Sequence, residues 1–176
     1  MAVCPVVTLP AAVLKRRADP TSGASESLAT DLVDTMRVSP GCVGLAAPQI
    51  GISLRAFALD VSGHPKGKPN HGLVVLFDPE VIFSEGSEVR REGCMSVPDF
   101  TANVRRALRV VVRGLDIDGN ARVYEAEGFE ARAFQHELDH LDGLLILDRV
   151  ASLSTDVFRR KVYQPPPSDP LPPSAA

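Results

Sequence analysis

The sequence lacks several features that would place it in common classes of protein. No apolar run approaches the roughly 20 residues that a helix needs to cross a bilayer. There is no basic excess either: a net charge of −3 argues against a general nucleic-acid binder, although it leaves room for a local basic patch. The three cysteines, Cys4, Cys42 and Cys94, are odd in number and far apart, so we expect a reducing compartment and no disulfide framework.

The N-terminal stretch MAVCPVVTLPAAVLKRR also lacks the order of a secretory signal. Its positive charges follow the apolar residues instead of preceding them, and Pro5 and Pro10 interrupt the apolar part. Together with the cysteine usage, this order predicts a cytoplasmic protein with no membrane partner.

The chain has 176 residues, 44% of them hydrophobic, which suits one domain with a substantial core. Proline and glycine breakers predict that residues 1–24 form an irregular arm packed on that domain. Residues 25–150 are expected to form the domain itself. The remainder, 151–176, is predicted to contain a short helix or turn and then a disordered tail, because QPPPSDPLPPSAA is rich in proline and poor in apolar residues.

Hydrophobic spacing predicts two helices separated by a run of strands. One helix is expected over 25–38, where Leu28, Leu32 and Met36 form a stripe, and the other over 130–142, ending at Gly143. Alternation and turn residues predict strands at 52–60, at 73–89 as a pair on either side of Asp78-Pro79, at 104–128 as a hairpin turning at 118–120, and at LLILDRV as a short strand. Mostly adjacent strands with helices at either end indicate an α+β domain instead of a βαβ parallel sheet.

The stretch FQHELDHLDG, residues 134–143, carries the chemistry of the second helix. His136 and His140 lie one turn apart on one face, so both can direct a ring nitrogen at one metal ion. Glu137 is the next residue round the helix and can reach a ligand on that ion without coordinating it. An apolar stripe occupies roughly the opposite side, formed by Phe134, Leu138, Leu141 and Leu145. Both sides require burial, which predicts a helix running through the interior; a solvated helix with incidental histidines is the alternative.

Two histidines leave a metal short of a third protein ligand, and the segment REGCMSVP, residues 91–98, supplies a candidate. Cys94 stands beside Gly93, and a thiolate with two imidazoles is an accepted ligand set for a divalent ion with one open position. A buried structural cysteine is the competing interpretation. His64 and His71 are poor candidates for a further ligand, because both lie in a polar loop where solvent exposure is expected.

A third segment, GCVGLAAPQIG at 41–51, combines small residues with the side-chain amide of Gln49. Taken alone, it predicts a plain connector between a helix and a strand. Beside a Cys/His/His site, however, small residues let a substrate approach the backbone closely, and the amide can polarise a carbonyl group. We therefore expect this segment to form one wall of a substrate site.

Together the three segments resemble the peptide deformylase family, whose motifs GxGLAAxQ, EGCxS and HExDH occur in this order. Here they stand as CVGLAAPQ (42–49), EGCMS (92–96) and HELDH (136–140), and the similarity extends from about Val6 to Val150. The resemblance implies an α+β fold in which antiparallel β-sheets wrap around a central helix carrying the HExxH motif, with 25–150 as the catalytic domain. It implies a metal-dependent hydrolase that removes the formyl group from formyl-methionyl nascent polypeptides and releases formate.

The resemblance also implies roles for individual residues. One divalent ion per chain is bound by Cys94, His136 and His140, with Fe²⁺ as the first choice and Zn²⁺, Ni²⁺ or Co²⁺ as alternatives. Glu137 is implied to act as a proton shuttle in catalysis. The Gln49 amide and the backbone N–H of Met95 are implied to donate hydrogen bonds to the developing oxyanion. The substrate site is implied to include strand edges that pair with the peptide, and the residues Val43, Gly44, Arg132 and Glu92.

The partners implied by the resemblance are an N-formyl-Met peptide and nascent chains at the ribosome, for a monomer in a bacterial-type cytoplasm without specific DNA binding. One departure concerns Cys42, which replaces the first glycine of the loop motif; a requirement for positive φ there would narrow the substrate range. Two other enzymes stay open: a deformylase relative with another formylated substrate, and an HExxH metallopeptidase, which would leave Gln49 without a role. A structural metal domain is the non-enzymatic alternative, although such sites normally have four protein ligands.

Overall fold

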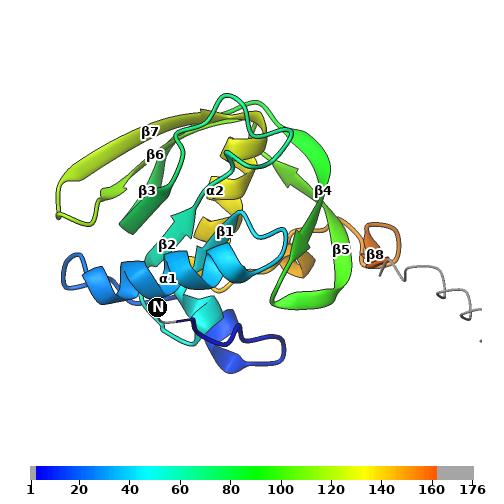
Figure 1. Cartoon of the computed structure of the whole chain (residues 1–176). Coiled ribbons are helices and arrows are strands. Elements are labelled where there is room, and N and C mark those ends of the chain that lie inside the picture. The colour runs from blue at the N-terminus through cyan, green and yellow to red at the C-terminus, as the bar shows by residue number, and fades with distance from the viewer. Residues whose placement is uncertain (1–2, 162–176) are drawn as a thin grey trace, which may run out of the picture.

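Two antiparallel sheets enclose one central helix in the computed structural model, which describes residues 3–161 (Figure 1). The predicted proline-rich tail lies outside the described residues. The five-stranded sheet has the order β1-β2-β3-β6-β7, with strands Gly44–Ala46, Ala56–Leu59, Val74–Glu85, Arg109–Leu115 and Ala121–Glu127. The three-stranded sheet has the order β4-β5-β8, with strands Glu88–Cys94, Val97–Arg106 and Val157–Arg159. The strand pairs are antiparallel, which confirms the predicted fold class.

Helix α1, Glu26–Val38, begins where the sequence predicts. Ser25 caps it by accepting a hydrogen bond from the N–H of Leu28. Its apolar stripe is buried in a cluster that includes residues of β1 and β2. Figure 1 shows α1 lying across the front of the molecule, next to the loop that leads into β1. The helix therefore supports the 41–51 segment from one side.

Helix α2, Gly128–Leu141, is the central helix that the two stripes predict. Its apolar side packs in the core against the five-stranded sheet through Phe134, Leu138 and Leu141. The polar side is buried as well, with Glu137 3% and His140 1% exposed. Gly143 follows the helix with a left-handed φ of 73°, as its position predicts. Neither α2 nor any other helix in residues 3–161 is long and apolar enough to cross a membrane.

The predicted break at Asp78-Pro79 is wrong, because β3 continues through this dipeptide as a bulge. The register between β3 and β6 shifts between Phe77 and Glu80, and Asp78 has a φ of 47°. The bulge accommodates a proline that has no N–H to offer the ladder. The separation between β3 and β4 falls instead at Gly86, which has a left-handed φ of 67°.

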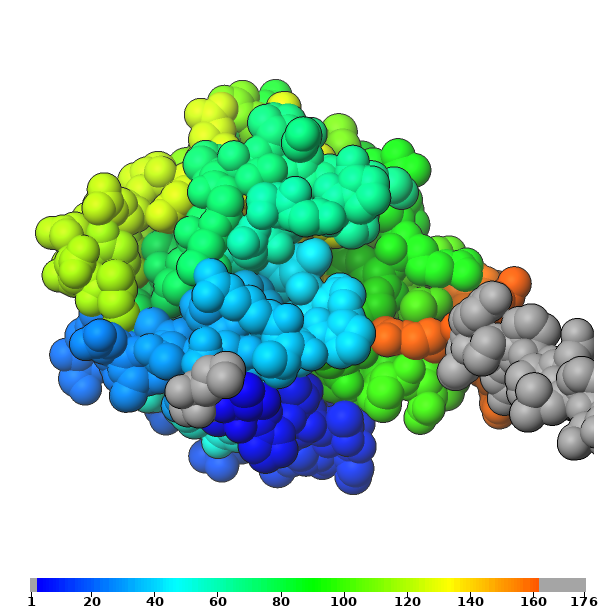
Figure 2. Space-filling model, viewed as in Figure 1, coloured from blue at the N-terminus to red at the C-terminus, as the bar shows by residue number. Residues whose placement is uncertain are grey.

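The chain after α2 also differs from expectation. Part of LLILDRV forms a 3-10 helix, η3 (Ile146–Asp148), and not a strand, because the Asp148 carboxylate accepts the N–H of Leu145 and closes a turn. A turn at 153–155 then leads to β8, a strand that no sequence signal predicted. β8 pairs with β5. In Figure 2 this segment, in orange, is seated against the green hairpin of β4 and β5.

Residues 3–24 contact two loops on which the site depends. The Val7 N–H donates to the carbonyl of Gln49 at 2.8 Å, and the Leu9 N–H donates to that of Ser96 at 3.0 Å. A 3-10 helix in this arm, η1 (Ala12–Lys15), buries Leu14 completely. The arm, dark blue in Figure 2, thus ties the 41–51 segment to the turn between β4 and β5.

Candidate active site

Three side chains singled out from the sequence meet beside α2. Cys94 is the last residue of β4, and His136 and His140 stand one turn apart on α2. One ligating atom from each lies within 4.8 Å of the others. The Cys94 Sγ is 3.4 Å from His140 Nε2, and the centroids of the two imidazole rings are 4.9 Å apart. One sulfur and two nitrogens at this spacing fit a divalent ion with a position left for a further ligand.

A buried ion-pair network orients one of these imidazoles. His136 Nδ1 lies 2.9 Å from a Glu92 oxygen, which leaves Nε2 for a metal. Arg106 holds Glu92 with two hydrogen bonds, at 2.9 and 3.0 Å, and reaches Asp139 with a third. Burial by itself raises the pKa of Glu92, but the hydrogen bonds from His136 and Arg106 outweigh it and lower the pKa to about 2. Glu92 therefore stays ionised and in place.

The two histidines differ in their affinity for a proton. Burial, followed by the charges of His136 and Arg106, holds the pKa of His140 well below its usual range. Burial also disfavours protonation of His136, but hydrogen bonds with Cys94 and Glu92 outweigh it and raise that pKa well above the usual range. His136 therefore holds a proton more firmly than His140 does, and metal binding would release that proton.

The Glu137 carboxylate is buried beside this cluster and depends on a glycine of the facing loop. Its Oε2 has no hydrogen-bond partner among the described residues. A Cβ on Gly44 would lie 2.4 Å from Oε1, so glycine is needed to leave room there. Burial raises the pKa of Glu137 to about 7. The carboxyl group can therefore take up and return a proton near neutral pH.

Gln49 lies in a short 3-10 helix, η2 (Ala47–Ile50), and is 2% exposed. Its amide oxygen accepts the N–H of Ala46 at 3.0 Å, which leaves the amide nitrogen to face the cluster. That nitrogen is 3.2 Å from the Ser96 hydroxyl oxygen and 3.7 Å from Cys94 Sγ. A donor held beside the metal ligands in this way can stabilise negative charge there in exchange for one of these two contacts.

A cleft of about 350 Å³ opens onto these residues. It is bounded by the loop that leads into β1, by the end of β4 and by α2. His140 is buried and does not line it, whereas the other residues predicted for the site do: Val43, Gly44, Gln49, Glu92, Cys94, Met95, Arg132, His136 and Glu137. The three sequence segments thus form one site, as their chemistry predicts.

Two charged or polar lining residues make contacts that the sequence did not indicate. His64 was expected to be exposed, but it is half-buried and stacks on Phe129, with ring centroids 4.0 Å apart and planes 7° apart. No periodicity in its Gly/Pro-rich loop could have indicated this contact. Arg132 donates to Glu88 at 2.6 Å, so its charge is paired on the cleft wall, while its buried Nε has no partner among the described residues.

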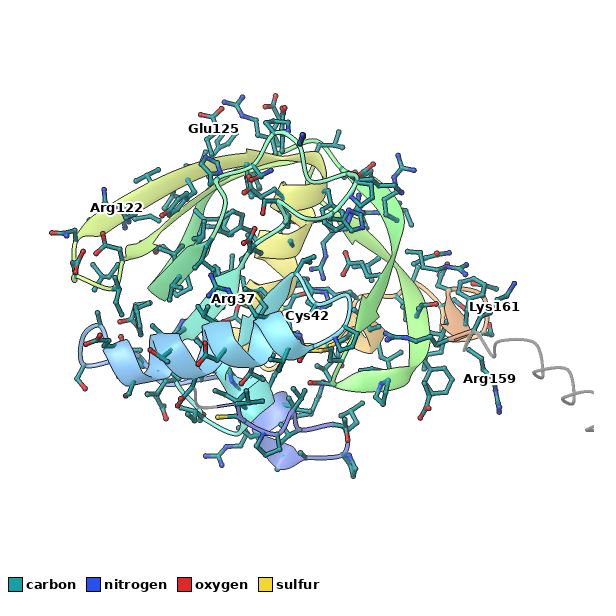
Figure 3. All side chains as sticks on the ribbon, viewed as in Figure 1. Arg37, Cys42, Arg122, Glu125, Arg159 and Lys161 are labelled. Carbon is teal, nitrogen blue, oxygen red and sulfur yellow. The ribbon has the colours of Figure 1, made fainter. Side chains whose placement is uncertain are left out.

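Cys42, in the loop between α1 and β1 (Figure 3), does not need the backbone freedom of the glycine it replaces. The positive φ of the loop, 69°, falls on Gly41. The Cys42 Sγ donates to the carbonyl of Gly44 at 3.0 Å. Burial, reinforced by the Glu137 charge, raises the pKa of this thiol to about 12. Cys42 is therefore a neutral, unstrained part of the wall.

Two arginines at the site were missed. Arg106 could have been found, because Ala102, Val104 and Arg106 alternate along β5 and all three face inward. Arg160 lines the cleft from the residue after β8, and no local pattern marks it. Its place depends on strand pairing between segments far apart in the sequence.

The α+β fold places antiparallel sheets around a helix, and its cleft holds one sulfur and two nitrogens beside a buried carboxylate. These features define a metal-dependent hydrolase. Residues 3–156 match the polypeptide deformylase family. The chain belongs to this family, whose members remove the N-formyl group from nascent polypeptides, and this is its function. The metallopeptidase alternative is not favoured.

Peptide deformylases resemble this chain both in sequence and in structure. Peptide deformylase of Thermodesulfovibrio yellowstonii is 41% identical over 164 residues, covering 92% of this chain and 97% of that protein. The crystal structure of a peptide deformylase from Legionella pneumophila matches with a TM-score of 0.77 and 39% identity, over 86% of this chain and 88% of its own. A Met-Ala-Ser-bound class I type b peptide deformylase from Acinetobacter baumannii matches with a TM-score of 0.78 and 35% identity, over 85% of this chain and 100% of its own.

Proposed function

We propose that this cleft hydrolyses the formyl amide bond of formyl-methionyl chains on one divalent ion held by Cys94, His136 and His140. The observation that carries the proposal is the meeting of three ligating atoms within 4.8 Å of one another, beside a buried carboxylate whose pKa is about 7. Formate and a free N-terminal amine are the products.

The donor set suits a resident metal ion. Cys94 offers a soft sulfur, and the Glu92 contact leaves one nitrogen of His136 for coordination. Fe²⁺ is the proposed ion, and Zn²⁺, Ni²⁺ or Co²⁺ fit the same donors. When bound, such an ion supplies a Lewis acid that brings the pKa of water toward neutrality.

Glu137 is the proposed proton shuttle. Its carboxylate takes a proton from the water whose oxygen attacks the formyl carbon. It then returns this proton to the amide nitrogen as the carbon–nitrogen bond breaks, which yields formate and the free amine. A pKa of about 7 suits both steps, because the group can be ionised before the attack and protonated after it.

The developing oxyanion is proposed to accept hydrogen bonds from the Gln49 amide and the Met95 N–H. The Gln49 nitrogen supports this role because Ala46 holds the other end of the amide and the side chain is buried. Met95 supports it because it follows Cys94 directly and lines the same cleft. Donors fixed before the reaction lower the barrier most effectively, since they do not have to reorganise when charge appears.

The peptide is proposed to bind between two sheet edges. β1 is the terminal strand of one sheet, and β4 is the terminal strand of the other. Both border the cleft, through Gly44 on one side and Glu92 on the other, so an extended chain can add to them by backbone hydrogen bonds. The Glu92 side chain is committed to Arg106, which leaves its backbone for the substrate. Val43 and Arg132 are proposed to contact the methionine side chain.

The protein is proposed to act as a cytoplasmic monomer on chains at the ribosome, with no membrane or specific DNA partner. Residues 25–150 would form the catalytic domain, with 1–24 as an arm and 151–176 as the remainder. A basic residue on the surface would have to make any contact with ribosomal RNA, and Arg106 is unsuitable because it is 5% exposed and paired with Glu92. Lys161, just beyond β8, is exposed and is the proposed contact (Figure 3). Co-sedimentation with ribosomes that weakens as salt is added would support this contact. No co-sedimentation, or co-sedimentation that salt does not weaken, would contradict it.

Formate release from formyl-Met-Ala-Ser tests the proposal, with anaerobically purified protein loaded separately with each of the four ions. Glu137→Ala should abolish release while the metal stays bound, because the three ligands remain. Glu125→Ala is the matched control, since this side chain is exposed on β7. No formate with any ion, while Cys94 remains reduced, would overturn the proposal, and cleavage of unformylated peptides would favour a metallopeptidase instead.

A further inference from the structure

The end of the described chain brings a cation to the cleft that no motif indicated. Arg160 follows β8, and its N–H donates to the Asp99 carbonyl at 2.8 Å. The Arg91 guanidinium on β4 lies over the Phe158 ring on β8, 3.5 Å from its centroid. This cation–π contact helps to hold β8 against the hairpin of β4 and β5. Arg160 consequently lines the same cleft as the proposed catalytic groups. Figure 2 shows the orange segment meeting both the green hairpin and the cyan loop at this place.

The Arg160 side chain reaches the backbone of a metal-ligand residue. Its Nη2 donates to the Cys94 carbonyl oxygen at 3.2 Å. This approach depends on Gly93, because a Cβ there would lie 2.6 Å from Nη2 and would push the guanidinium away. Hydrogen bonds from charged donors are about twice as strong as neutral ones. The contact therefore holds the Cys94 carbonyl in one direction.

The bonded carbonyl belongs to the peptide group that also carries the Met95 N–H. The cis peptide bonds in residues 3–161 precede Pro10 and Pro69, so the Cys94–Met95 peptide is trans. In a planar trans peptide the N–H points opposite to the C=O, and fixing one fixes the other. A cation on the oxygen also draws electron density from the nitrogen, which makes the N–H a stronger donor.

We infer that Arg160 is a positioning residue for the oxyanion site: through the Cys94 carbonyl it orients and polarises the Met95 N–H. The inference rests on the proposed function, in which that N–H donates to the oxyanion. Arg160 touches no reacting atom in this role, so its loss slows the chemical step and leaves peptide binding intact. Removing an oxyanion donor outright costs about 10²–10³ in rate, so weakening one is expected to cost roughly tenfold.

The experiment compares Arg160→Ala with a matched control, Arg159→Ala, from the same segment. Arg159 is exposed at the outer end of β8 (Figure 3). Steady-state deformylation of formyl-Met-Ala-Ser and bound metal are measured for both. Arg160→Ala is expected to lower kcat roughly tenfold with KM within about twofold of wild type, and added methylguanidinium is expected to restore part of kcat. Arg159→Ala is expected to behave as wild type.

An unchanged kcat in Arg160→Ala overturns the inference. A raised KM at unchanged kcat also overturns it, because Arg160 would then bind the peptide directly. If Arg160→Ala loses its metal, Arg160→Gln is measured in its place: a lowered kcat with metal bound supports the inference, and wild-type kcat overturns it. Failure of the proposed function has a different signature, because the wild-type protein itself would then release no formate.

Discussion

Replacing Gly44 by alanine adds one methyl group where the loop into β1 meets the proposed proton shuttle. The new Cβ would lie 2.4 Å from Glu137 Oε1, whereas ordinary contact begins at 3.4 Å. Glu137 is 3% exposed, so its carboxylate can give way only toward the cleft that it lines. Its carboxylate therefore has to retreat by about 1 Å, a misplacement that typically costs 10²-fold in rate. We expect Gly44→Ala to lower kcat on the order of 100-fold while the metal stays bound.

Gly63→Ala is the matched control, because a Cβ at Gly63 meets nothing within 4 Å. Formate release, metal content per chain and melting temperature are measured for both variants. Overpacking at Gly44 is expected to cost about 1–3 kcal/mol of stability as well, so activity is compared at a temperature where both variants are folded. A Gly44→Ala protein that keeps kcat within about threefold of wild type would refute the argument from crowding at Glu137.

Three further predictions concern the surroundings of the site. Gln49→Ala is expected to lower kcat roughly 10²–10³-fold in the formate assay, and a loss below about fivefold would contradict its role at the oxyanion. Arg106→Met removes the arginine that holds the buried Glu92 carboxylate and leaves Asp139 with Arg149 alone, so it should cost about 3–5 kcal/mol in urea unfolding, whereas Arg122→Met, at an exposed guanidinium, should leave the urea midpoint nearly unchanged. Burial raises the pKa of Asp148, but the hydrogen bond from Lys15 outweighs it and holds the pKa below the usual 3.8. The pair therefore stabilises the fold above pH 3.8 and loses this contribution as pH falls through the lower folded pKa. Asp148→Asn should accordingly cost about 0.5 kcal/mol at pH 7 and less as the pH falls below 3.8, and a loss in urea titrations that does not change with pH would contradict the linkage.

The parts of the fold that could be predicted from the sequence are those determined by spacing within one element. One side of α2 carries apolar residues and the other carries the two histidines. The 3.6-residue period alone therefore predicts that the helix is buried and that the histidines lie on one face. The hairpin of β6 and β7 likewise turns within the predicted 118–120 stretch. The site segments were recognisable because their chemistry requires particular residue types within a few positions of one another.

The parts that could not be predicted depend on contacts across the sequence. Arg160 reaches Cys94 only because β8 pairs with β5, and that pairing joins residues more than 50 positions apart. His64 stacks on Phe129 across a loop without periodicity. At Asp78-Pro79 a local rule failed for a physical reason: the Asp78 carboxylate accepts the N–H and hydroxyl of Thr21, which stabilises a bulge where a strand end was expected.

The partners of the buried acids explain why Glu137, and not a neighbouring carboxylate, is suited to move protons. Glu92 is ion-paired with Arg106, and its pKa is held at about 2. Asp139 on α2 is paired with the same arginine, and Glu130 with His71. Glu137 shares the helix and the burial but has an oxygen without a partner, and its pKa is about 7. Glu92 and Glu137 are thus separated into a fixed anion and a titrating group, because only Glu92 accepts hydrogen bonds from His136 and Arg106. A change that supplied Glu137 with a cation of its own would lower its pKa and weaken it as a base, even with every ligand in place.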